Sequence, residues 1–167
     1  MLTKAQQEYL LTIPEDKVVK IHPFDPKIPN IAKDIIDQVH SVKPDLEVLF
    51  MGASGLGISG QGDLDLYMLS SKKDFEKYLL DLTNVLGEPA IKGTSIKWQF
   101  EKDGHEIEIY LTDPTSPSMQ KQVKVFEMLK NNPDLLKEYK ELKESSDGLL
   151  FREYMKRKYE FYNRLLG

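Results

Sequence analysis

The chain has 167 residues, of which 40% are hydrophobic and 30% charged, and it contains no cysteine. This composition is typical of a folded domain in water, and the lack of cysteine excludes disulfides and thiolate metal sites. The net charge of −4 disfavours a long polyanion held by bulk electrostatics. No apolar run is long enough to span a membrane, and the polar N-terminus lacks the apolar segment of a secretory signal. We therefore expect a cytoplasmic protein without membrane contact.

The first half of the chain alternates between helical and strand patterns. Helices are recognised by apolar residues that recur every three or four positions, and strands by short apolar or alternating runs. Helices are expected over residues 4–11 (capped by Thr3), 28–42 and 72–86, and strands over 17–21 (KVVKI), 46–51 (LEVLFM) and 63–69 (DLDLYML).

The second half predicts a hairpin followed by helices. SIKWQFEKDGHEIEIYLT contains Asp103-Gly104, a favoured two-residue turn between strands, and we expect His105 to be exposed in that turn. Asn132 caps a helix that has Pro133 at its first position, and a last helix is expected over 149–166. The order of elements predicts an α+β fold with an α/β-type mixed sheet, in a single domain that covers residues 1–167.

Two pairs of acids stand on predicted strands with one residue between them. Asp63 and Asp65 share one face of their strand, because residues two apart point the same way, and Glu106 and Glu108 do the same on the second strand of the hairpin. If the two strands are neighbours, these carboxylates crowd one surface and need a cation. Carboxylate oxygens suit Mg²⁺ or Mn²⁺.

The segment before the first acid pair is rich in glycine. GASGLGISGQGD (52–63) contains five glycines and two serines. A loop without side chains lets backbone N–H groups approach phosphate oxygens, and a serine hydroxyl adds a donor. We therefore expect Gly52, Ser54 and Gly62 to bind the phosphates of a nucleoside triphosphate next to the metal-binding acids.

These motifs resemble the signature of the DNA polymerase β-type nucleotidyltransferase superfamily. Met51-Gly52 opens the signature, Asp63-Leu64-Asp65 supplies two acids, and Glu106 or Glu108 stands where a third acid is expected. One departure is Ala53, which follows Gly52 at a position where that superfamily has Gly or Ser.

Within the superfamily, the chain is most similar to the GrpB family over most of its length. NPDLLKEYKELK (132–143) resembles that family's HPELAREYAALK-type helix, and HEIEIYLTDPTSPSMQKQVKVFEML (105–129) resembles its strand, turn and helix. Tyr154, Lys158 and Phe161 match the family's Y-x-x-x-K-x-x-F. The resemblance implies a nucleotidyltransferase-like core with C-terminal helices, and it implies that Lys158 neutralises triphosphate charge.

The leading hypothesis is a metal-dependent nucleotidyltransferase that uses Mg²⁺ or Mn²⁺. Asp63 and Asp65 would hold the metal, with Glu106 or Glu108 as further ligands, and Glu108 would position or deprotonate the acceptor hydroxyl. The acceptor is open: a small molecule, an RNA or a protein. The alternative is a catalytically silent protein that binds a nucleotide or phosphometabolite. A third reading is an interaction protein whose acids only solvate one face of the sheet.

Overall fold

The computed structural model describes every residue from Met1 to Gly167. Its centre is a five-stranded mixed sheet with the strand order β1-β2-β5-β4-β3. The two central strands β2 and β5 run parallel, and every other neighbouring pair is antiparallel. The strands are β1 (Glu47–Met51), β2 (Leu64–Leu69), β3 (Ile91–Lys92), β4 (Ile96–Lys102) and β5 (His105–Thr112).

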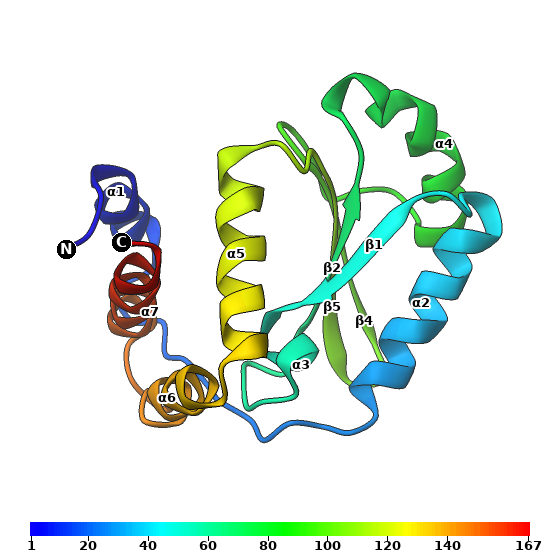
Figure 1. Cartoon of the computed structure of the whole chain (residues 1–167). Helices are drawn as coiled ribbons and strands as arrows, with labels where there is room; N and C mark the ends of the chain where they lie inside the picture. Colours follow the sequence, from blue (N-terminus) through cyan, green and yellow to red (C-terminus); the bar gives the residue numbers. More distant parts are fainter.

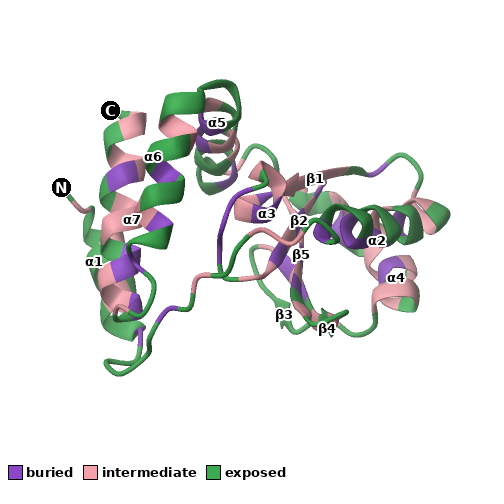
Figure 2. Cartoon of the chain, turned by 90° about the horizontal axis from the view of Figure 1, so that it is seen from below, coloured by how far each residue is buried: buried purple, intermediate pink, exposed green.

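Helices lie on both sides of this sheet. Figure 1 shows α2 and α4 on one side and α5 on the other, with α7 and α1 beyond α5. Seen from below, α1, α5, α6 and α7 form one group beside the sheet (Figure 2). The helices are α1 (Lys4–Thr12), α2 (Ile28–Val42), α3 (Gly52–Leu56), α4 (Phe75–Leu86, preceded by a 3₁₀ turn, Lys72–Asp74), α5 (Pro117–Asn131), α6 (Pro133–Glu144) and α7 (Phe151–Leu166).

The main core lies between the sheet and the α2–α4 layer. Alternation along β2 and β5 sends Leu64, Leu66 and Met68, and likewise Ile107 and Ile109, to one face, where they are fully buried. Isoleucines and valines spaced along α2 cover them. The opposite face of the same strands therefore carries the residues in between, which are the acids of the sequence motif. Two smaller apolar clusters hold α1, α6 and α7 together.

Most of the predicted elements are confirmed. α1 begins after a capping box in which Thr3 and Gln6 bond to each other's backbone N–H groups. The hairpin turns at Asp103 (φ 52°) and Gly104 (φ 81°), both in the left-handed region that a two-residue turn of this kind requires. Asn132 caps α6 through its side chain, with Pro133 at the first position. The α+β class with a mixed sheet is confirmed.

Three predictions about local structure differ from what is observed, and one strand was not predicted. The KVVKI segment is not a strand: it makes one isolated bridge, Val18 to Leu150, because no sheet edge runs beside it. The glycine-rich segment begins as the short helix α3 rather than as a loop, and the two-residue strand β3 had no recognisable pattern. The last helix begins at Phe151 instead of residue 149. None of the helices combines the length and the apolar run that crossing a bilayer requires.

Candidate functional site

The parallel pairing of β2 and β5 brings three carboxylates together. The register places Asp65 directly opposite Glu108, and Asp63 immediately precedes β2 on the same face. Carboxylate oxygens of Asp63, Asp65 and Glu108 all lie within 4.8 Å of one another. Three carboxylates at this spacing form a set of hard oxygen ligands that could hold a divalent ion such as Mg²⁺ or Mn²⁺.

A missing side chain at Gly52 makes room for this cluster. Gly52 follows Met51, the last residue of β1, whose register partner is Asp65. A Cβ atom on Gly52 would lie 2.5 Å from Oδ2 of Asp65, and the φ of Gly52 is +73°, which disfavours any residue with a side chain. Because it has no side chain, Gly52 allows the chain to turn from β1 into α3 in direct contact with the Asp65 carboxylate.

The carboxylates are partly removed from water and repel one another. The pKa of Asp65 lies well above its usual range because of burial, followed by the charges of Asp63 and Glu108. The pKa of Asp63 is also raised, first by burial and then by Glu108. Burial and like charge both disfavour the ionised forms. A bound cation would remove the repulsion and restore full ionisation.

Glu108 is held in place by its neighbours, and Glu106 stands apart. The Tyr110 hydroxyl donates to Oε2 of Glu108 at 2.9 Å, and Lys97 Nζ lies 3.4 Å from Oε1. Glu106 is exposed, faces Glu101 across the hairpin and receives a hydrogen bond from the Gln99 side chain. The structure thus brings Glu108 into the cluster and leaves out Glu106, one of the four residues expected to bind metal.

The remaining residues of the glycine-rich segment brace it against the sheet. The Ser54 hydroxyl donates to the carbonyl of Asp63 at 2.6 Å, so its proton is used inside the protein. The Gly62 carbonyl lies 2.7 Å from Nδ1 of His105, whose Nε2 lies 2.8 Å from Asp25. Both contacts, the Gly62 carbonyl first, raise the pKa of His105. His105 is therefore the first residue of β5 and largely covered, which corrects the expectation that it is exposed.

Two lysines from the C-terminal helices complete the charge balance of the site. Lys158 of α7 is partly buried, and its pKa is raised by Tyr162 most strongly, then by Tyr154, Asp65 and Asp63. The effect of both aspartates on Lys158 is mutual, since Lys158 also lowers their pKa values. Lys158 therefore provides a positive charge next to the acid cluster, from a helix that lies far from it in sequence.

Lys143 of α6 is a functional candidate that the sequence analysis missed. Only 3% of it is exposed, and its Nζ donates to the Tyr154 hydroxyl at 2.7 Å while lying 4.8 Å from the ring centre of Tyr139. No carboxylate lies within ion-pair distance of its ammonium. Burial, reinforced by the charge of Lys158, lowers the pKa of Lys143 to about 7, against the opposing effect of Asp63 and Asp65.

A signal for Lys143 was present in the sequence. It stands four positions after Tyr139, on the same stripe of α6 that faces the interior, where a lysine breaks the apolar pattern. Burying a lysine without an acidic partner costs free energy of folding. A lysine that interrupts the apolar stripe of a helix therefore indicates a functional site.

Comparison with known proteins gives a structural match and no sequence match. No family model and no curated protein matches the chain. The crystal structure of the conserved protein GrpB from Enterococcus faecalis is similar over 88% of this chain and 99% of that one, with a TM-score of 0.62 and 11% identity. The chain has the GrpB fold.

Two further solved structures share parts of this arrangement. A Cid1 poly(U) polymerase bound to MgGTP matches 79% of this chain and 43% of its own length, at a TM-score of 0.49 and 14% identity. The CdnE c-di-GMP synthase from Capnocytophaga granulosa matches 53% of this chain and 34% of its own, at 0.38 and 21%. With TM-scores below 0.5 neither of these two matches extends the conclusion, and the likeness to GrpB is the one that supports the fold expected from the sequence.

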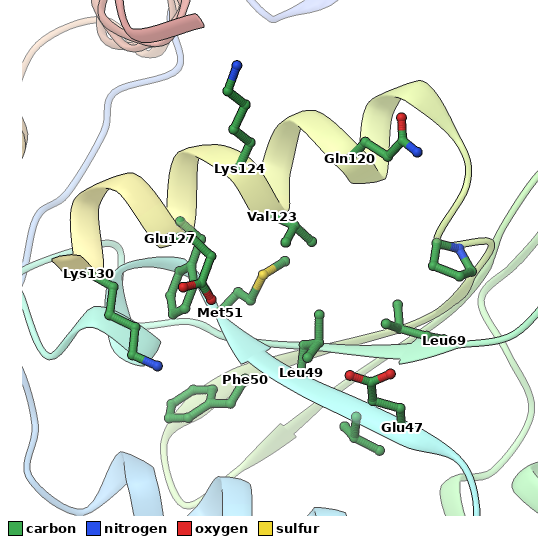
Figure 3. A pocket seen from close by; sticks show the side chains of 13 residues that line it. Glu47, Leu49, Phe50, Met51, Leu69, Gln120, Val123, Lys124, Glu127 and Lys130 are labelled. Carbon is green, nitrogen blue, oxygen red and sulfur yellow. The ribbon is translucent and has the colours of Figure 1, made fainter.

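A cavity away from the acid cluster measures about 650 Å³. It lies between the edge strand β1 and α5, with Leu49, Met51 and Val123 among its walls (Figure 3). None of the three clustered carboxylates lines it. The chemistry of the carboxylates, rather than the size of a cavity, identifies the candidate site.

Proposed function

We propose that this protein is a metal-dependent nucleotidyltransferase that transfers a nucleoside monophosphate from a nucleoside triphosphate to an acceptor hydroxyl. The observation that carries the proposal is the convergence of Asp63, Asp65 and Glu108 within 4.8 Å from two parallel strands. A bound Mg²⁺ or Mn²⁺ would supply charge stabilisation at the α-phosphate and alignment of the triphosphate.

Each side chain of the site has a role that its environment supports. Asp63 and Asp65 would hold the metal, and backbone N–H groups at Gly52 and Gly62 would approach the phosphates, whereas the Ser54 hydroxyl that the sequence assigned to this role donates to the Asp63 carbonyl instead. Lys158 would neutralise triphosphate charge, and Lys143 would be a second ammonium that a bound polyanion favours in its charged form.

The reaction is an in-line substitution at phosphorus. The acceptor oxygen forms a bond to the α-phosphorus, the bond from that phosphorus to the bridging oxygen of the β-phosphate breaks, and pyrophosphate leaves. Glu108 lies where it can orient the acceptor hydroxyl and receive its proton, which then passes to solvent. Positioning and charge neutralisation supply most of the rate, as expected for phosphoryl chemistry.

One observation favours a second candidate, a nucleotide- or phosphometabolite-binding protein without turnover. Both oxygens of Glu108 already interact within the protein, one with Lys97 and one with Tyr110. If these contacts persist with substrate bound, the carboxylate is a structural ligand and does not accept a proton. Nucleotide would then bind with the metal, and no pyrophosphate would be released.

The test is a thermal-shift screen of ATP, GTP, CTP and UTP with and without Mg²⁺ or Mn²⁺, on the unmodified protein, on Asp65→Asn and on Glu101→Gln. Glu101 is an exposed carboxylate on β4 outside the cluster and serves as the matched control. We expect metal-dependent stabilisation by at least one nucleotide in the unmodified protein and in Glu101→Gln, and none in Asp65→Asn. Equal stabilisation of all three proteins would remove the metal site from the proposal.

Turnover is measured separately, as pyrophosphate release in the presence of a panel of hydroxyl acceptors. Release that depends on Asp65 supports the transferase. Metal-dependent binding combined with background release across the panel supports the silent binding protein instead.

A further inference from the structure

A small polar pocket lies on the same face of the sheet as the carboxylates, two residues further along both central strands. Tyr67 follows Asp65 by two positions on β2, and Tyr110 follows Glu108 by two on β5. The register pairs Tyr67 with Tyr110 as it pairs the two acids. Their rings stack with centres 5.0 Å apart and planes at 10°. The stacked rings thus form a platform that continues the acidic surface.

The platform is one side of a pocket of about 160 Å³. Thr112 at the end of β5 and Ser95 just before β4 lie beside the two rings, and the first turns of α5 close the pocket through Ser118, Met119 and Gln122. At roughly 30 Å³ per molecule of liquid water, this volume corresponds to about five waters. It accommodates a small polyol or the ring of one pentose.

The chemistry of the lining is uniform. Six of the seven lining residues have a hydroxyl or amide side chain, and none has a charge. Among those six side chains only Tyr110 forms a hydrogen bond within the protein, to Glu108. The others are therefore free to exchange hydrogen bonds with a ligand. An uncharged set of hydroxyls and an amide beside two aromatic rings suits a neutral polyhydroxylated molecule. A lysine, Lys97, lies over the Tyr110 ring with its ammonium 5.5 Å from the ring centre and is paired with Glu108.

The pocket also has a defined connection to the proposed chemistry. Tyr110 lines the pocket, and its hydroxyl donates to Oε2 of Glu108 at 2.9 Å. Tyr110 therefore connects the pocket to the third carboxylate of the cluster. Glu108 itself does not line the pocket, so a ligand hydroxyl would reach its carboxylate from the side of Tyr110.

We infer that this Tyr67–Tyr110 pocket binds the acceptor, and that the acceptor is a neutral polyol or sugar whose hydroxyl points toward Glu108. The inference rests on the proposed nucleotidyltransferase function for the role of the ligand, and on the pocket alone for its chemical class. It predicts that a neutral polyol binds here in preference to inorganic phosphate.

The experiment is a ¹H–¹⁵N NMR titration of the full chain with D-ribose, and separately with inorganic phosphate. A ligand of this size in a pocket of this kind has a Kd on the order of 10 mM. We expect ribose to shift the amide signals of Ser95, Thr112 and Ser118, and phosphate to leave them in place. Shifts by phosphate at these residues, or ribose shifts scattered over the surface, would overturn the inference.

Matched variants separate the pocket from general surface effects. Thr112→Val keeps the shape and removes a hydroxyl from the pocket, and Thr94→Val makes the same change at an exposed residue outside it. We expect ribose affinity to fall about fivefold in Thr112→Val, the cost of one neutral hydrogen bond, and to be unchanged in Thr94→Val. Tyr67→Phe, which keeps the ring, is a second variant with the same expectation. Unchanged affinity in both pocket variants would contradict the assignment.

The result is independent of nucleotide binding. If ribose binds in the pocket and no nucleotide binds in the thermal-shift screen, the pocket stands and the transferase proposal fails. If nucleotides bind with metal and ribose shifts no pocket residue, the transferase proposal stands and the acceptor class is wrong.

Discussion

The two halves of the molecule bury different kinds of side chain. The sheet half, with α2 and α4, has a core of aliphatic side chains plus Trp98 and Phe75, and all its clustered charges are negative. The helical half, α1 and α5 to α7, mixes aliphatic and aromatic side chains in its core, and its one fully buried charge is Lys143. Of the three clustered carboxylates only Glu108 has a lysine partner within the sheet half, Lys97, whereas Lys158 of the helical half lowers the pKa of Asp63 and Asp65.

This difference explains why the C-terminal helices matter for a site built on strands. Lys143 and Lys158 lower the pKa of Asp63, and the aspartates raise the pKa of both lysines. The mutual effect is too small to return Asp65 or Lys143 to ordinary behaviour, because burial dominates at both. Burial therefore favours the neutral forms of Asp65 and Lys143, and a bound cation and a bound polyanion would favour their charged forms.

The largest effect on the reaction rate is expected in the sheet half, from a comparison of Glu106 and Glu108, two glutamates of β5. Glu108→Gln removes a carboxylate of the cluster, and we expect nucleotidyl transfer to fall by about 100-fold or more. Glu106→Gln changes the same residue type two positions away, outside the cluster, and should leave the rate within a factor of about two. The measurement is initial rate of pyrophosphate release. Equal losses would mean that both acids are ligands, as the sequence alone allowed.

The second test moves to the helical half and uses pH. The pKa of Lys143 is about 7 in the folded protein and near 10.5 in the unfolded chain, so between these values the unfolded chain binds more protons. The contribution of Lys143 to stability therefore rises as pH rises from about 7 to about 10, and it is least favourable below pH 7. Lys143→Met should stabilise the metal-free protein by about 2 kcal/mol or more at pH 6.5, and less at pH 9.5.

Urea unfolding at the two pH values provides the measurement. Lys140→Met, an exposed lysine on the same helix, is the control and should change stability by less than about 0.5 kcal/mol at either pH. A loss of stability in Lys143→Met at pH 6.5 would mean that the buried ammonium stabilises the fold, contrary to the expected cost of its burial.

The third test concerns the contact between Gly52 and Asp65. Gly52→Ala and Gly57→Ala introduce the same methyl at nearly the same φ, +73° and +70°, but only the first meets an atom within 4 Å, Oδ2 of Asp65. Both should lose about 1–2 kcal/mol of stability from backbone strain. Only Gly52→Ala should also lose the stabilisation by Mg²⁺ and nucleotide, because it displaces a ligand. Similar metal responses in the two variants would show that the close approach is unimportant for the site.

Period-two alternation was enough to place the acids and the core. Asp63 and Asp65 share a face, as do Glu106 and Glu108, and the leucines and isoleucines between them fill the core. The hairpin followed from Asp103-Gly104, since only a few residue pairs accept two positive φ values. These are local rules, and local rules are visible in a sequence.

The choice between Glu106 and Glu108 was not visible, because it depends on register across the parallel pair. β2 and β5 are separated by α4, β3 and β4, and nothing in either strand states which residues will be opposite. The prediction of a strand at KVVKI was wrong for a related reason. The pattern of the segment suits a strand, but a strand also needs a neighbouring strand with which to pair. Lys143 was missed because its environment is created by α7, a separate helix.

The smallest effect is expected at the hydrogen bond that holds Lys143. Tyr154→Phe removes the acceptor at 2.7 Å and leaves a buried ammonium without that partner, which should cost about 1–2 kcal/mol at pH 6.5. In the Lys143→Met background the same change removes no such bond, so its cost should shrink by about 1 kcal/mol. A double-mutant cycle in urea measures this coupling. Additive costs would indicate that Tyr154 supports the packing of the helical half independently of Lys143, and that the hydrogen bond between α6 and α7 contributes nothing to stability.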